Sequence, residues 1–359
     1  MQTLTISTGL RYAYTDSGPP GNSTNYSTLF FIHGYAFYST GICKRLVAAA
    51  PAQDVRLICI NRRAYPGSTP FSEDEQRVFR SGADDERLGL LHEEGKNLAL
   101  LVDALIVDLD LPPRVTILAW SMGNIYLLAL LASINYLPHD VASRLISHTT
   151  SFILWDPPDE ALGYDRPCLY TPFTDDTIPP DQRGPAFIRW LGKYWTHDPA
   201  PRDPHRLNAH LPNLYPRPTT DSMPPEELKI LTDFAAASTC DNWVVHPTLM
   251  HIVATLREEV LCAPEVVEAW RNPDIHYLWT EHGPWMMFWA KWCLEDDLAR
   301  RYKDALPREK DGLLCGKEDL PRRKADVPHI KFSIMEGCNH FSQWDAPEVT
   351  LNAFRRCMR

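Results

Sequence analysis

The chain has 359 residues, of which 44% are hydrophobic and 11% aromatic, so it can bury a substantial core and is not expected to be disordered. Its formal net charge of −10 argues against a nucleic-acid-binding surface. Residues 1–20 lack the apolar run of a signal peptide, and no later stretch has the length and apolar character of a membrane span. We therefore expect a protein with no nucleic-acid partner and no membrane span.

Nine cysteines are scattered without any Cys-x-x-Cys pair, which favours reduced thiols and a cytoplasmic location. No cluster of His, Cys or Asp has the spacing of metal ligands, so we expect neither a metal nor another cofactor. The sequence leaves the oligomeric state open, and a homodimer is compatible with it.

The first predicted elements are a hairpin over residues 4–15 and a buried strand at Leu29–Ile32. That strand runs directly into His33-Gly34-Tyr35-Ala36, where the glycine lets the backbone turn sharply and point N–H groups beyond the sheet. A second buried strand at Val55–Ile60 precedes Arg63-Ala64-Tyr65-Pro66-Gly67-Ser68. Apolar residues spaced three and four apart predict a helix over residues 93–108.

A strand, a tight turn and a helix follow, with Ser121 at the turn. The strand begins at Val115, and residues 124–132 are typical of a helix. Small residues at Ala119 and Gly123, two positions before and two after the serine, fit a nucleophile elbow, although the usual pattern has glycine at the first of these positions. The alternative is an ordinary strand–turn–helix with an incidental serine.

Residues 151–155 predict the next strand, which ends at Asp156 and two prolines. The alternation of strands and helices then stops, and residues 157–272 show only helical patterns, so we interpret them as an inserted helical cap, or lid. Residues 1–156 and 273–359 would form the core. We expect the cap to supply only pocket walls, so that loosening it alters substrate choice more than attack on a small activated ester. The sheet resumes at residues 275–279, and a last strand at residues 330–335 leads to Gly337-Cys338-Asn339-His340.

This arrangement predicts an α/β protein with a mostly parallel sheet covered by helices on both faces, and functional groups at the carboxyl ends of its strands. Four landmarks in order make the sequence resemble the α/β-hydrolase superfamily over nearly the whole chain outside the cap. They are the His33-Gly34 turn, the residue 63–68 loop, the Ser121 elbow and the Gly337–His340 loop.

The resemblance implies a nucleophile, a base and an oxyanion hole. Ser121 would be the nucleophile, His340 the general base that takes its proton, and the backbone N–H groups of Tyr35 and Met122 the oxyanion hole. This fits general chemistry, because a serine hydroxyl is a weak nucleophile near neutral pH unless an imidazole removes its proton during attack.

The third catalytic member has two candidates. Most of the superfamily places the acid after the strand that follows the cap, but there this chain has Gly283 where an aspartate is expected, with Glu281 two residues earlier. Some members place the acid after the strand that follows the elbow helix, where this chain has Asp156. We predict Asp156 and keep Glu281 as the alternative.

The predicted function is that of a serine hydrolase acting on an ester or lactone of an apolar small molecule, with an amide or thioester as alternative substrates. A serine nucleophile disfavours epoxide hydrolase and dehalogenase chemistry, which uses a carboxylate in related families. An acyltransferase or a lyase could use the same three residues. A ligand receptor that keeps the fold without turnover is the alternative from another class.

Overall fold

The computed structural model describes residues 1–21, 24–200, 202–271, 274–305 and 330–358. In this part of the chain one eight-stranded sheet has the order β1-β2-β4-β3-β5-β6-β7-β8. The strands are β1 Gln2–Thr5, β2 Arg11–Asp16, β3 Ser27–Ile32, β4 Val55–Ile60, β5 Val115–Trp120, β6 Thr149–Trp155, β7 Asp274–Thr280 and β8 Ile330–Met335.

The predicted hairpin and the predicted parallel sheet are both confirmed. β1 is antiparallel to β2, and β2 is antiparallel to β4. The remaining strands, in the order β4, β3, β5, β6, β7 and β8, are all parallel to one another. The register aligns Ile32 with Ala119, and Trp120 with Trp155 on the next strand. The carboxyl ends of the central strands therefore lie side by side.

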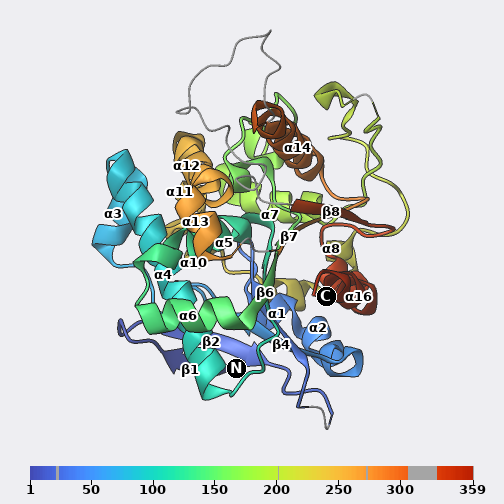
Figure 1. Cartoon of the computed structure of the whole chain (residues 1–359). Helices are drawn as coiled ribbons and strands as arrows, with labels where there is room; N and C mark the ends of the chain where they lie inside the picture. The colour runs from blue at the N-terminus through green and yellow to red at the C-terminus, as the bar shows by residue number, and fades with distance from the viewer. Residues whose placement is uncertain (22–23, 201, 272–273, 306–329, 359) are drawn as a thin grey trace, which may run out of the picture.

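Both faces of the sheet are covered, as the alternation of side chains along each strand requires. Phe30 and Ile117 belong to a core with α4 (Asp84–Asp108) and α5 (Asn124–Ala132), and Phe31 and Leu118 to a second core with α2 (Lys44–Ala49) and α16 (Pro347–Cys357). Figure 1 shows α4 and α6 (His139–His148) on one side of the sheet and α2 and α16 on the other. The helices that precede β7 are α1 Ser39–Ile42, α2 Lys44–Ala49, α3 Glu73–Ser81, α4 Asp84–Asp108, α5 Asn124–Ala132, α6 His139–His148, α7 Pro180–Leu191, α8 Thr219–Ser222, α9 Pro225–Leu231, α10 Phe234–Thr239, α11 Asp241–Val244, α12 Met250–Cys262 and α13 Pro264–Ala269.

Three further helices follow β7, namely α14 Trp285–Ala305, α15 Ser342–Asp345 and α16 Pro347–Cys357. Between β6 and β7 the described residues contain helices and no strand of the sheet. The division into a core and a cap stays a prediction. In the part of the chain that the structure describes, no helix combines the length and the apolar character needed to cross a membrane.

Two helices differ from the sequence prediction. α4 begins at Asp84 rather than near residue 93, and α3 was not predicted. The first turn of α4 and most of α3 are polar, which weakens the hydrophobic periodicity that identifies a helix. The local signal for α3 is a capping box, in which Ser72 and Glu75 bond to each other's backbone N–H groups.

Candidate active site

Ser121 lies at a sharp turn between β5 and α5. Its backbone has φ = +58°, an unusual conformation for a residue with a side chain, and a short 3₁₀ helix at Ser121–Gly123 leads into α5. A Cβ atom added at Gly123 would lie 2.4 Å from the His33 carbonyl oxygen, so only glycine allows this turn to pack against the loop after β3. The turn holds the serine side chain at the carboxyl end of the sheet.

His340 reaches Ser121 from the loop after β8. Its Nε2 lies 3.0 Å from Ser121 Oγ, and its side chain is almost completely buried. Trp120 also contacts His340. Its indole N–H donates to the His340 carbonyl at 3.0 Å, and the centroids of the two rings are 4.9 Å apart. The imidazole is therefore fixed within hydrogen-bond distance of the serine hydroxyl.

Asp156 completes a continuous row of three side chains. Its Oδ2 lies 2.9 Å from His340 Nδ1, and its carboxyl group is fully buried at the end of β6. When Nδ1–H donates to this carboxylate, Nε2 is left to accept the hydroxyl proton of Ser121. The structure thus brings together Ser121, His340 and Asp156 in the geometry that general-base activation requires.

Thr280, at the end of β7, holds the Asp156 carboxylate. Its hydroxyl donates to Asp156 Oδ2 at 2.6 Å, and its backbone N–H donates to Oδ1 at 2.8 Å. Sequence reasoning did not single out this residue. Its only signal is its place at the end of the strand next to β6, where a side chain can reach the end of its neighbour.

The alternative acid, Glu281, has a different environment. Its carboxylate accepts the Gly337 backbone N–H at 2.7 Å, and 46% of its side chain is exposed. In the described structure it makes no hydrogen bond with His340. A Cβ atom at Gly283, where the superfamily pattern has its aspartate, would lie 3.5 Å from Asp156 Oδ2. The Asp156 carboxylate therefore occupies the space beside Gly283.

The predicted oxyanion residues, Tyr35 and Met122, both border the same cavity as Ser121. A Cβ atom added at Gly34 would lie 2.8 Å from Ser121 Cβ, so the loop after β3 approaches the serine closely. Within the described residues, the Tyr35 backbone N–H has no hydrogen-bond acceptor. Donors without a protein partner beside a nucleophile can stabilise a developing negative charge.

A second residue that sequence reasoning missed is Asn124, at the start of α5. Its side-chain amide donates to the Ser121 carbonyl at 2.7 Å and to the Trp155 carbonyl at 3.2 Å. Asn124 therefore connects the serine turn to Trp155, the last residue of β6, which directly precedes Asp156. An asparagine directly after the elbow is the only sequence signal for this role.

The cavity above Ser121 has a volume of about 440 Å³ and is mostly apolar. Its aromatic walls come from Tyr35, Phe37, Trp120, Phe173, Phe187 and Phe341. Burial, with Asp241 as a smaller contribution, raises the pKa of the Tyr35 phenol, so the hydroxyl stays protonated and donates to Asn242 at 2.8 Å. Among the described residues, no group of three or more His, Cys, Asp and Glu side chains is arranged to hold a metal ion.

Comparison with known proteins gives a family and a fold. The family model described as "Alpha/beta hydrolase family" matches residues 29–353, and a search of curated proteins found no match. Among solved structures, a bromoperoxidase from Bacillus anthracis is 14% identical, with 99% of each chain covered and a TM-score of 0.50. An esterase from Exiguobacterium antarcticum is 12% identical, covers 99% of this chain and 98% of its own, and has a TM-score of 0.48. The expected fold is confirmed, and identities this low show the fold alone.

Proposed function

Because the chain belongs to the alpha/beta hydrolase family, we propose that it is a serine hydrolase that cleaves an ester or lactone of an apolar small molecule. The observation that carries the proposal is the buried row from Ser121 Oγ through His340 to Asp156, with distances of 3.0 and 2.9 Å. A row of this kind activates a serine in acyl-transfer enzymes on several unrelated folds.

In the proposed mechanism, Ser121 Oγ attacks the carbonyl carbon of the substrate while His340 Nε2 takes the hydroxyl proton. The carbonyl oxygen becomes an oxyanion, which the N–H groups of Tyr35 and Met122 stabilise. The C–O bond to the leaving group then breaks as His340 returns the proton to that oxygen, which leaves an acyl-enzyme. Water, activated by His340 in the same way, releases the acid and restores Ser121.

Asp156 would keep the tautomer of His340 fixed and stabilise its cationic form during each proton transfer. Thr280 supports this role, because two donors on one residue hold the carboxylate in place. Glu281 stays the alternative acid. Its exposure and its bond to the Gly337 N–H favour a role in holding the loop that carries His340.

The substrate proposal rests on the cavity. Phe173, Phe187 and Leu191 line it together with core residues, which supports residues 157–272 acting as a cap that encloses the substrate. An apolar acyl or aryl group fits such walls, because transfer of apolar surface from water into them is favourable. The cytoplasmic location and a homodimer stay predictions.

The test combines a fluorophosphonate probe with a short-chain nitrophenyl ester. We expect labelling of wild-type protein at Ser121 alone, together with ester turnover, and neither in Ser121→Ala. Labelling without hydrolysis of any ester or lactone would favour an acyltransferase or a lyase. A protein that is not labelled at all would refute the proposal and favour a ligand receptor.

A further inference from the structure

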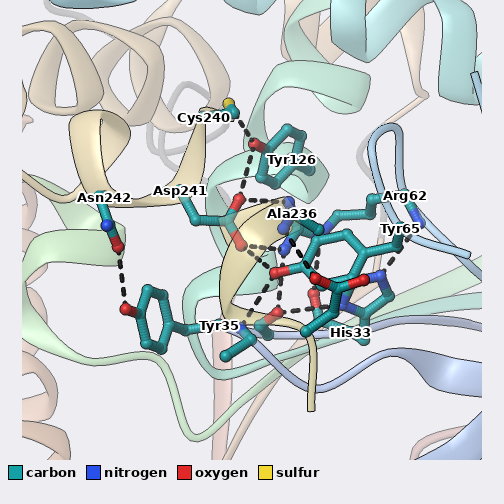
Figure 2. A network of polar contacts seen from close by, with 12 residues as sticks. His33, Tyr35, Arg62, Tyr65, Tyr126, Ala236, Cys240, Asp241 and Asn242 are labelled. Atoms are coloured by element: carbon teal, nitrogen blue, oxygen red, sulfur yellow. Dashed lines mark hydrogen bonds and ion pairs between the residues drawn. The ribbon is translucent and has the colours of Figure 1, made fainter. Parts of the chain in front are cut away.

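A buried ion pair connects α11, within the helical segment of residues 157–272, to the loop after β3 that carries Tyr35. Arg62 follows β4 and Asp241 lies in α11, and their side chains are 3% and 1% exposed. Arg62 Nη1 and Nη2 donate to the two carboxylate oxygens of Asp241, each at 2.8 Å. Figure 2 shows Asp241 facing the Arg62 guanidinium, with Tyr126 on one side and Tyr65 on the other. A bidentate pair of this kind fixes the position of the guanidinium group.

The same guanidinium holds two carbonyl groups of the loop after β3. Arg62 Nε donates to the His33 carbonyl at 3.1 Å, and Nη2 donates to the Gly34 carbonyl at 2.9 Å. The Arg62 backbone N–H also donates to His33 Nε2 at 3.0 Å, which fixes the ring of that residue.

The orientation of one peptide unit follows from these contacts. In a trans peptide the C=O and N–H groups point in opposite directions. The Gly34 carbonyl points at Arg62, so the N–H in the same unit, which belongs to Tyr35, points away from Arg62. The next N–H along the chain, that of Ala36, donates to the Tyr65 hydroxyl at 3.0 Å, and this hydroxyl in turn donates to Asp241 at 2.5 Å.

Asp241 therefore holds the loop by two routes, one through Arg62 and one through Tyr65. In the described structure it is the only carboxylate paired with Arg62, and the guanidinium otherwise contacts backbone carbonyls and the faces of Tyr65 and Tyr126. Without this carboxylate the buried cation would lack a counter-charge, and an uncompensated buried charge strongly destabilises the arrangement around it.

We propose that Asp241 and Arg62 are positioning residues, which hold the Gly34–Tyr35 peptide so that the Tyr35 N–H faces the oxyanion formed at Ser121. The inference rests on the proposed serine-hydrolase function and deepens it. It also changes the expected role of the helical segment, because Asp241 makes the oxyanion hole depend on the seating of α11. The segment then contributes to transition-state stabilisation as well as to the pocket walls.

The test compares Asp241→Asn with Asp16→Asn. Asp16 forms a similar bidentate pair with Arg56 at the other end of β4, where the side chains are 8% and 7% exposed. For Asp241→Asn we expect kcat to fall by about 10- to 100-fold, approaching the loss seen when an oxyanion donor is removed, with KM changed less than about threefold. For Asp16→Asn we expect a similar loss of stability and kcat within about twofold of wild type.

A trifluoromethyl ketone gives a second measurement, because it forms an oxyanion adduct with an active serine. We expect Asp241→Asn to weaken this inhibitor in proportion to kcat, while a neutral, non-reactive ester analogue binds as before. Equal kcat in Asp241→Asn and Asp16→Asn, or equal weakening of both inhibitors, would overturn the inference.

Tyr65→Phe covers the case in which Asp241→Asn does not fold. It removes the hydroxyl that joins Ala36 and Asp241 without leaving a buried charge unpaired, and we expect a loss of about three- to tenfold confined to kcat. Unchanged kcat in a folded Tyr65→Phe protein would then overturn the inference. Failure of the parent proposal looks different, because wild-type protein itself would then resist the fluorophosphonate probe, and the inference would fall with it.

Discussion

Two buried polar networks border the same cavity, and they are built differently. The first runs from Ser121 through His340 and Asp156 to Thr280, and its members lie at or just beyond the carboxyl ends of β5, β8, β6 and β7. The second runs from the Tyr35 loop through Arg62 to Asp241 and leaves the sheet for α11. Neighbouring parallel strands fix the first network, whereas the second needs a helix from another layer. The first network thus holds the proposed catalytic residues. The second holds Asp241, through which the proposed oxyanion hole would depend on the position of the cap.

The largest expected effect is at the head of the first network. Ser121→Ala should fold normally and lose about three or more orders of magnitude in turnover, because only binding and oxyanion stabilisation remain. A nitrophenyl ester assay and a thermal melt measure the two properties. The control is Ser133→Ala, which removes another buried serine hydroxyl, bonded to the Leu130 carbonyl, and should keep turnover within about twofold. Equal turnover in both variants would remove Ser121 from the mechanism.

The next effect tests which acid belongs to the first network. Asp156→Asn should lower turnover by about two to four orders of magnitude, because the amide favours the wrong tautomer of His340 and carries no charge. Glu281→Gln should cost less than about tenfold, since its carboxylate meets a backbone N–H and solvent. Both are measured on folded protein with the same ester. The reverse ranking would move the acid to Glu281.

A smaller effect is expected at the far end of the same network. Thr280→Val removes the hydroxyl that donates to Asp156 Oδ2 and keeps the shape of the side chain. We expect kcat to fall by about tenfold, the equivalent of one hydrogen bond to a charged group. Thr116→Val is the matched control, because its hydroxyl meets Ser151 inside the sheet, remote from the cavity walls. A kcat unchanged by Thr280→Val would make Thr280 a purely structural contact.

The smallest expected effect is on how stability depends on pH, and His33, which contacts Arg62 in the second network, contributes to it. Burial, and then the Arg62 cation, holds the pKa of His33 well below its usual value. Burial likewise lowers the pKa of His197 to about 4. Both rings are neutral in the folded protein but take up protons when unfolded below about pH 6.5, so stability is full above that pH and falls as the pH decreases towards the folded values.

Urea unfolding at about pH 7.5 and about pH 5.5 measures this dependence. We expect His197 to account for about 1.4 kcal/mol of the loss between these conditions, from a linkage of that size per pH unit. His197→Asn should therefore reduce the dependence and leave the part due to His33. The control is His205→Asn, because His205 is exposed. An identical pH dependence in both variants would contradict the assignment to His197.

The sheet was predictable because most of its strands are short runs that are either apolar throughout or alternate apolar and polar residues. Val55–Ile60 and Ile330–Met335 occur with the predicted bounds, and so does α5. The start of α4, which packs on this sheet, was less well predicted, since the first turn of the helix is polar. The three candidate catalytic residues could be chosen from their positions in the sequence. Ser121 and Asp156 directly follow predicted strands, and His340 lies in the loop after the last one. Their catalytic roles stay predictions.

The second network could not be predicted in the same way. Arg62 and Asp241 are 179 positions apart, and neither belongs to a spaced motif. Thr280 and Asp156 are 124 positions apart. A single sequence shows that an arginine follows a strand, but which carboxylate meets it depends on how α11 packs over the sheet. Local patterns place elements, whereas contacts between layers arise from tertiary packing.

The position of β8 has a consequence for how activity would be lost. β8 is one of the two edge strands of the described sheet, paired with β7 alone, and it leads into the loop that carries His340. Edge strands open locally at a lower free energy than central strands, so β8 can fray while β5 and β6 remain folded. Each such opening would withdraw the imidazole and leave Ser121 and Asp156 in place. The protein would then lose catalysis reversibly under conditions too mild to melt its core, and its inactivation would report on one strand rather than on the whole fold.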